Sequence, residues 1–375
     1  MRRIASHYTL YNGELERNIV VEVDDLGTIT NILRCDAIDS MASVEFFPGI
    51  LIPGMVNCHC HLELSYLKGA IAEGEGYAGF ARSIGAVRNN FTTEERIRSA
   101  RLADAQMWEE GIEAVADIAN DDLVMGVKTQ SKIEYHTLFE FFGLNNRDVE
   151  PHFDLANRYP RSFVTPHSTY SVQDEPFRQI CTRNSSLLSI HLLESDVEEG
   201  LYHGRGSLHE WYQRMGWECD FLKYESPAER IAKSVNPKSN LLLVHNTRAT
   251  AKDIATVESH TKNGTWVLCP ESNRFISNDK PPVDMLKEMG VKIAVGTDSL
   301  ASARSLSMID NLRLLGNHPL KELLTWATIN GAKALGIDAM KGAIEIGKRP
   351  GLVVIEGADL HNLCLTPESV AHRII

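Results

Sequence analysis

The chain has 375 residues, 43% hydrophobic and 23% charged, an ordinary composition for a folded protein with more than one small core. Its formal net charge of −12 argues against nucleic acid as a partner, since proteins that bind nucleic acids usually present a basic face. The sequence contains no apolar stretch of the roughly 20 residues that a membrane span needs, and its start lacks the apolar core of a signal peptide. We therefore expect a cytoplasmic protein with no membrane partner. Seven cysteines, an odd number, do not suggest a disulfide framework.

The two ends of the chain have the pattern of short strands and turns. In NIVVEVDDLGTITNIL, β-branched residues lie on both sides of Asp25, Leu26 and Gly27, which is typical of a β-hairpin. The segment GAIEIGKRPGLVVIEG near the C-terminus also has two β-rich runs. We expect residues 1–52 and 339–375 to form a small β-sandwich domain around a separate unit of residues 53–338.

The middle of the chain alternates between apolar runs of strand length and helical patterns. The clearest helix is TTEERIRSARLADAQMWEEG, where Thr92 and Glu95 match a capping box and Gly111 ends the helix. Strands that alternate with helices in this way predict a (β/α)8 TIM-type barrel, and the long stretch 182–240 predicts an insertion of extra helices. The apolar runs are residues 50–58, 112–118, 133–142, 161–166, 187–193, 241–246, 265–269 and 291–296.

Functional side chains of such a barrel gather at the carboxyl ends of its strands. The first run leads into VNCHCHLELS, where strict alternation would put His59 and His61 on one face. The interleaved Cys58 and Cys60 would then point to the opposite face as packing residues. By itself, a His-x-His pattern is a weak indication of a metal site.

Later runs end in residues of the same kinds. The fifth strand is expected to end at His191, with Glu194 three residues on, the sixth at His245 and the eighth at Asp298. Each residue alone has an ordinary structural explanation, such as a helix cap, but their common location at one end of the barrel favours a joint site. Three imidazoles and one carboxylate suit Zn²⁺, which makes hydroxide available at neutral pH, and a nearby carboxylate can move protons.

Several segments together resemble the amidohydrolase superfamily. The resemblance is to the branch that holds cytosine-deaminase-like enzymes and the deaminases of adenosylhomocysteine, methylthioadenosine and aminofutalosine. It covers nearly the whole chain. The segments are PGMVNCHCHLELS (53–65), TPHSTYSV (165–172), HLLES (191–195), VHN (244–246), LCPESN (268–273), GTDSLAS (296–302) and GKRPGLVVI (347–355).

The resemblance implies a role for each residue. One divalent metal ion, zinc with iron as the alternative, would be held by the four ligands His59, His61, His191 and Asp298. Glu194 would be the proton shuttle, His245 would orient the attacking hydroxide, Asp298 would also act as base, and His167 would contact the substrate. Relatives with two metals carry a lysine at the end of strand 4, where this chain has Thr165, Pro166 and His167, so one metal is expected.

The remaining residues near these motifs are expected to support the site. Ser272 and Asn273 would shape the substrate pocket, Cys269 would be structural, and Glu63 would fix the loop after the histidines. For Glu140, a place inside the site and a buried pairing partner are equally open.

The residues and the resemblance together predict a metal-dependent aminohydrolase that releases ammonia from an amino-substituted heterocycle of adenine or a related type. The resemblance favours an adenine nucleoside derivative as that substrate. Two alternatives remain at this point. One is a hydrolase of another bond on the same scaffold, such as an amide, imidazolone or C–Cl bond. The other is a catalytically silent barrel that binds a ligand. The expected partner is a small-molecule substrate, and the sequence leaves a homo-oligomer open.

Overall fold

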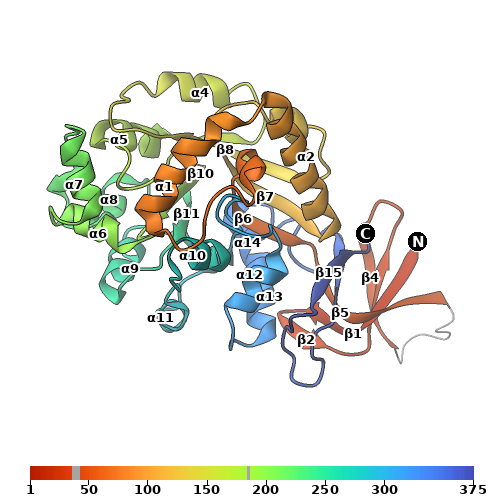
Figure 1. Cartoon of the computed structure of the whole chain (residues 1–375). Helices are drawn as coiled ribbons and strands as arrows, with labels where there is room; N and C mark the ends of the chain where they lie inside the picture. The colour runs from red at the N-terminus through yellow and green to blue at the C-terminus, as the bar shows by residue number, and fades with distance from the viewer. Residues whose placement is uncertain (36–42, 184–185) are drawn as a thin grey trace.

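The computed structural model describes residues 1–35, 43–183 and 186–375. Both termini lie in one seven-stranded sheet at one end of the molecule (Figure 1). The strand order is β15-β14-β5-β1-β3-β4, and β2 pairs with β1. The strands are β1 (Arg2–Tyr11), β2 (Glu14–Glu16), β3 (Ile19–Val23), β4 (Ile29–Arg34), β5 (Val44–Pro53), β14 (Leu352–Glu356) and β15 (Val370–Arg373).

The terminal sheet confirms that the two ends of the chain fold together. Strands β3 and β4 are antiparallel, and Gly27, with a φ of +79°, makes the turn of the predicted hairpin. The C-terminal strand β14 pairs antiparallel with β5. Because the pairing of the described residues places all seven strands in one sheet, the expected β-sandwich is not confirmed.

The middle of the chain supplies two parallel sheets of four strands each, in the orders β6-β7-β8-β9 and β10-β11-β12-β13. Seven of the predicted runs coincide with one strand each, whereas the first, residues 50–58, is divided at Gly54 between β5 and β6. A side chain at Gly54 would collide with Glu113, since an added Cβ would lie 2.1 Å from its Cγ. The strands are β6 (Met55–Cys60), β7 (Ile112–Ala119), β8 (Glu134–Phe141), β9 (Ser162–Pro166), β10 (Leu187–Leu192), β11 (Asn240–His245), β12 (Asn263–Leu268) and β13 (Ile293–Val295).

The two parallel sheets meet at their carboxyl ends. Parallel bridges join Cys60 to Asp298 and Ser168 to His191, and the backbone N–H of Asp298 donates to the His59 carbonyl at 2.9 Å. The end of β6 therefore lies beside the segment after β13, and the loop after β9 lies beside the end of β10, although each pair of segments is separated in sequence.

Helices connect and cover the parallel strands (Figure 1). Helix α2 begins with the predicted capping box of Thr92 and Glu95. The predicted insertion is confirmed as α6, α7, η5 and α8 between β10 and β11, and Figure 1 shows these helices at the end of the molecule opposite the terminal sheet.

The first group of helices is η3 (Leu62–Leu67), α1 (Gly76–Val87), η4 (Arg88–Asn90), α2 (Thr93–Glu109), α3 (Met125–Lys128), α4 (Glu150–Ala156), α5 (Asp174–Arg183), α6 (Asp196–Tyr202) and α7 (Ser207–Arg214). The second group is η5 (Asp220–Lys223), α8 (Pro227–Ser234), α9 (Ala251–Glu258), α10 (Pro270–Ser277), α11 (Val283–Glu288), α12 (Met308–Leu314), α13 (Leu320–Ala327) and α14 (Ile329–Leu335). Among the described residues, no helix is both long and apolar enough to cross a membrane.

Candidate active site

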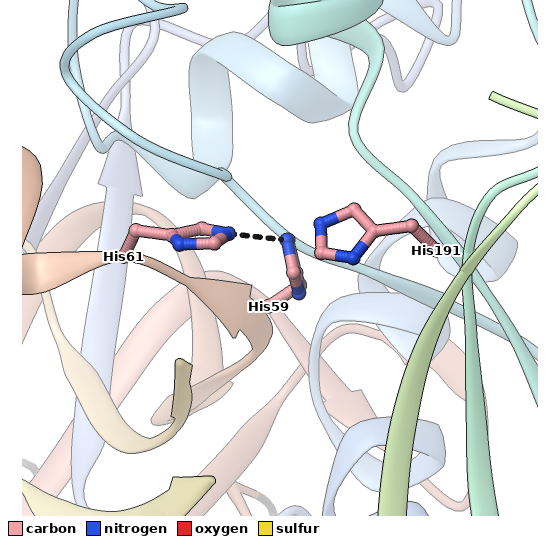
Figure 2. Close-up of side chains that lie close together, drawn as sticks. All are labelled: His59, His61 and His191. Carbon is pink, nitrogen blue, oxygen red and sulfur yellow. Dashed lines mark hydrogen bonds between the residues drawn. The ribbon is translucent and has the colours of Figure 1, made fainter. Parts of the chain in front are cut away.

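Three imidazoles converge where the two parallel sheets meet. His59 and His61 come from β6 and the residue after it, and His191 comes from β10 (Figure 2). One ring nitrogen of each lies within 4.8 Å of the others, and the Nε2 atoms of His59 and His61 are 3.2 Å apart. All three residues are buried, with at most 7% of their surface exposed.

Burial keeps these imidazoles neutral. It lowers the pKa of His61 to about 4 and lowers the pKa values of His59 and His191, with neighbouring histidines adding to the effect. The Nδ1–H of His191 donates to the His167 carbonyl at 2.7 Å, which leaves its Nε2 lone pair available. Neutral imidazoles with available lone pairs are the form that binds a metal ion.

Asp298 adds a carboxylate to this centre. Its Oδ1 lies 3.8 Å from the Nε2 of His59 and 3.6 Å from that of His61. Its Oδ2 accepts hydrogen bonds from Ser272 Oγ at 2.5 Å and Ser302 Oγ at 2.9 Å. The two oxygens therefore have separate partners, and the hydroxyls fix the orientation of the carboxylate.

Glu194 and His245 lie beside each other at the same centre. Glu194 Oε1 is 3.7 Å from His245 Nε2, and burial raises the pKa of Glu194 to about 6. His245 Nδ1 contacts Asn273 Oδ1 at 2.9 Å, so it carries the proton and Nε2 faces Glu194 as an acceptor. The imidazole of His245 also stacks on that of His191, with ring centroids 5.3 Å apart.

The three residues expected to contact substrate differ in their surroundings. His167 is partly exposed and stacks on His191 at a centroid distance of 4.5 Å, while its Nδ1 contacts Ser171 Oγ at 2.9 Å. Ser272 is fully buried and Asn273 is 4% exposed, and each makes its hydrogen bond to another predicted site residue, Asp298 or His245. This geometry favours a positioning role for Ser272 and Asn273 over direct contact with substrate.

The cysteines between the histidines are packing residues, but they do not share one face. Cys60 lies in the hydrophobic cluster that includes Met107 of α2, whereas Cys58 lies in the cluster that includes Ala332 of α14. The pairing of β6 with β7 shifts register between Asn57 and Cys60, so strict alternation fails in this segment. The prediction that both thiols point to one face was therefore wrong.

A second group of acids lies next to the first strand end. Asn120 donates through its backbone N–H and Nδ2 to the two oxygens of Glu63, at 3.0 and 2.7 Å, and through Nδ2 to Glu140 Oε1 at 2.8 Å. Glu63 thus ties the loop after β6 to the loop after β7, as expected. Glu140 is a buried partner in this group, and burial raises its pKa to about 8.

Comparison with known proteins places this arrangement in a family. Residues 50–371 match the model of the amidohydrolase family. This chain belongs to the amidohydrolase family. It is 31% identical over 339 residues to an adenosine deaminase of Helicobacter pylori, covering 83% of this chain and 80% of that protein. It is 28% identical to a 5-methylthioadenosine/S-adenosylhomocysteine deaminase of Teredinibacter turnerae, covering 84% of this chain and 73% of that protein.

A solved structure agrees with this assignment. The crystal structure of Helicobacter pylori aminofutalosine deaminase in complex with methylthio-coformycin superposes with a TM-score of 0.80 at 25% identity, covering 96% of this chain and 93% of that one. This amidohydrolase is therefore a hydrolase that acts on carbon–nitrogen bonds, built on a fold of the TIM-barrel type.

The donor set of this amidohydrolase fits a divalent metal ion. In a tetrahedral site with metal–nitrogen bonds of 2.0–2.1 Å, ligand nitrogens lie roughly 3.3 Å apart, close to the 3.2 Å that separates the Nε2 atoms of His59 and His61. Three neutral imidazoles and one carboxylate are ligands typical of such a site.

Sequence reasoning missed two residues in contact with Glu194. Tyr170 donates a hydrogen bond to its carboxylate, and Glu198 accepts one from its backbone. Tyr170 lies within the TPHSTYSV segment, and Glu198 follows Glu194 by four residues, which was the only local signal of a link between them. Only the tertiary structure shows that Tyr170 and Glu198 both contact Glu194, because it brings the loop after β9 next to the loop after β10.

Proposed function

We propose that this amidohydrolase removes the amino group of an adenine nucleoside derivative and releases it as ammonia. The observation that carries the proposal is the convergence of His59, His61, His191, Asp298 and Glu194 at one buried centre. The likeness to enzymes named as deaminases of adenosine, methylthioadenosine and adenosylhomocysteine supports the substrate class.

In this proposal, His59, His61, His191 and Asp298 hold one divalent ion, zinc with iron as the alternative. When bound, the ion supplies the Lewis acidity that makes water a nucleophile near neutral pH. The three imidazoles are neutral, so they can hold the ion without first losing protons.

The chain's own residues would move the protons. Asp298 would accept the proton that water loses as it attacks the carbon bearing the amino group. Glu194, whose pKa of about 6 lets it hold or release a proton near neutral pH, would protonate the ring nitrogen. His245 would orient the attacking water through Nε2, since Asn273 holds its other nitrogen. His167, the partly exposed imidazole, would contact the substrate.

The architecture in this proposal is a closed (β/α)8 barrel of residues 53–338, with residues 1–52 and 339–375 as a separate β domain. The bridges between β6 and the segment after β13, and between the loop after β9 and β10, support closure at both junctions of the two parallel sheets. Closure would bring all the proposed site residues to one mouth of the barrel.

The decisive test is an ammonia-release assay on purified protein of known metal content. We expect release from at least one of adenosine, methylthioadenosine, adenosylhomocysteine and aminofutalosine, and one tightly bound divalent ion per chain by elemental analysis. Ammonia from cytosine only, or turnover only of amides, imidazolones or C–Cl compounds, would instead assign the site to another reaction. Two tightly bound ions per chain in active protein would refute the single-metal assignment.

A further inference from the structure

Tyr170 holds one of the two carboxylate oxygens of Glu194. The tyrosine is 2% exposed, and its hydroxyl donates to Glu194 Oε2 at 2.8 Å. The other oxygen, Oε1, lies 3.7 Å from His245 Nε2. A glutamate carboxylate turns readily about its last torsion, so an unanchored Glu194 would present either oxygen to the site. The hydrogen bond from Tyr170 selects which one.

The backbone of Glu194 is held by a second residue. Its N–H donates to Glu198 Oε2 at 3.1 Å, and the other oxygen of Glu198 accepts a hydrogen bond from Thr169 Oγ1. Glu198 is fully buried in the first turn of α6. Two adjacent links therefore hold the loop after β9: Tyr170 joins it to Glu194 in the loop after β10, and Thr169 joins it to Glu198 in α6.

The helical insertion fixes the loop that carries these residues. Arg230 of α8 is fully buried and donates to the carbonyl oxygens of Thr169 at 2.6 Å and Val172 at 2.9 Å. The hydroxyl of Tyr202 donates to the same Thr169 oxygen at 2.7 Å, and that of Tyr212 donates to the Tyr170 carbonyl at 3.0 Å. The hydroxyl of Tyr170 thus projects toward Glu194 from a backbone held at three points.

We infer that Tyr170 is a positioning residue for proton transfer, which keeps Glu194 Oε1 turned toward the reacting atoms by holding Oε2. Because Tyr170 is 2% exposed and its hydroxyl is bonded to Glu194, it would act through the carboxylate and not by contact with the substrate. Precise placement of a proton-transfer group is worth a measurable part of its effect, because a small misplacement slows the chemical step. The inference rests on the proposed function, since it takes Glu194 as the proton shuttle.

The first test compares Tyr170→Phe with Tyr135→Phe in the full-length, metal-loaded enzyme. Tyr135 is a matched control because it is also buried, at 5% exposed, and its hydroxyl donates to a carboxylate, Asp104 Oδ1, at 2.7 Å. We expect Tyr170→Phe to lower kcat on the order of 10-fold with KM changed by less than about twofold. Tyr135→Phe should lower thermal stability by a similar amount and leave kcat unchanged.

The second test repeats Tyr170→Phe in a Glu194→Gln background, with rates measured in single turnovers at high enzyme concentration. If Tyr170 acts through Glu194, removing its hydroxyl should cost less than about twofold there. An equal loss in both backgrounds would overturn the inference, as would a rise in KM with unchanged kcat. Wild-type protein that releases no ammonia from the nucleoside panel would refute the proposed function, whereas active wild type with an equally active Tyr170→Phe variant would refute only this inference.

Glu198 gives a conservative rescue. In Glu198→Gln, the amide oxygen can accept from the Glu194 N–H while the amide nitrogen donates to Thr169 Oγ1, so both links survive. We expect Glu198→Gln to keep kcat within about threefold and Glu198→Met to lose on the order of 10-fold at equal metal content. Equal activity of the glutamine and methionine variants would show that these links do not position Glu194.

Discussion

Two buried carboxylates in this chain, Glu113 and Glu194, have opposite surroundings. Glu113, 5% exposed at the start of β7, is paired with Lys341 on one oxygen and Arg373 on the other. Glu194, at the far end of the parallel strands, receives a hydrogen bond from Tyr170 and lies near His245. Among the described residues, no lysine or arginine forms an ion pair with Glu194.

The difference separates a carboxylate that holds the fold from one suited to chemistry. Glu113 joins the parallel strands to the terminal sheet, since Arg373 lies on β15, and its ion pairs with Lys341 and Arg373 hold the carboxylate in place. Glu194 has no such compensation, so burial moves its pKa to about 6, where a proton can be gained and lost. Removing Glu113 should therefore lower stability, whereas removing Glu194 should lower the catalytic rate. The predictions below run from the largest expected effect to the smallest.

Asp298→Asn should have the largest effect. The amide removes the charge next to His59 and His61 and offers a hydrogen-bond donor where Ser272 and Ser302 now donate. We expect both metal content and kcat to collapse, with a rate loss beyond the roughly 10⁴-fold upper value for a single acid–base group. Elemental analysis alongside steady-state kinetics would test this, and full metal occupancy in the variant would contradict the ligand assignment.

Glu194→Gln should separate rate from metal binding. The variant keeps the size of the side chain and removes its titration, while the four proposed ligands are untouched. We expect kcat and kcat/KM to fall together by about 10²- to 10⁴-fold with metal content near wild type. The same two measurements apply, and retention of more than about a tenth of wild-type kcat would refute the shuttle role.

Glu113→Gln should change stability and leave catalysis intact. It would leave Lys341 and Arg373 without their partner, which we expect to lower the free energy of unfolding by roughly 3 kcal/mol, less than for a pair hidden completely from water. Denaturant unfolding with kcat per folded molecule would test this. Glu14→Gln is the control, because the pair of Glu14 with Lys321 is exposed and should contribute less than about 1 kcal/mol. A large loss of kcat in Glu113→Gln would contradict the purely structural role of Glu113.

Glu198 should make stability depend on pH. Burial raises its pKa from 4.5 to about 8, so the folded chain holds a proton that the unfolded chain releases between these values. The contribution is fully present below pH 4.5 and is lost as pH rises toward 8, with a limiting slope of about 1.4 kcal/mol per pH unit. Denaturant unfolding from pH 5 to 9 should show a shallower decline in Glu198→Gln than in wild type. Parallel curves would mean that Glu198 does not carry the proton.

The smallest effect is expected at the cysteines beside the metal ligands. Burial raises the pKa of Cys58 to about 12 and that of Cys60 well above its usual value, so both remain thiols. Cys58→Ala and Cys60→Ala should each cost about 1–2 kcal/mol of stability through lost packing and leave metal content unchanged. Metal loss from a folded Cys60→Ala protein would show that this thiol contributes to the centre.

Local pattern was enough to predict where the strands lie and which residues stand at their ends. Runs of apolar residues recur along the chain, and five residues lie at or just beyond the ends of these runs. The position of each along its strand could therefore be predicted from the local sequence alone. These residues are His59, His61, His191, His245 and Asp298. The capping box of α2 and the hairpin turn at Gly27 were predictable for the same reason, because the residues that make them are adjacent in sequence.

Only the tertiary structure decided which way several of these side chains turn. Along β11, Leu243 packs in the hydrophobic cluster that includes Ile254 of α9, whereas Val244 packs in the cluster that includes Ala332 of α14. Regular alternation would therefore turn His245 to the same side as Leu243, toward α9. Its φ of +75° breaks the alternation, and Asp298, with a φ of +58°, leaves the extended conformation in the same way.

The register shift between Asn57 and Cys60 and the hydrogen bond from Tyr170 to Glu194 both depend on contacts between segments that are distant in sequence. Alternation holds only while the backbone keeps regular strand angles, and at the strand ends those angles are set by contacts between segments far apart in sequence. Arg373 reaches Glu113 across 260 positions of the chain, and no local pattern in either segment predicts that pair. The sequence by itself therefore determined which residues could form the centre, and the packing of distant segments determined how they face one another.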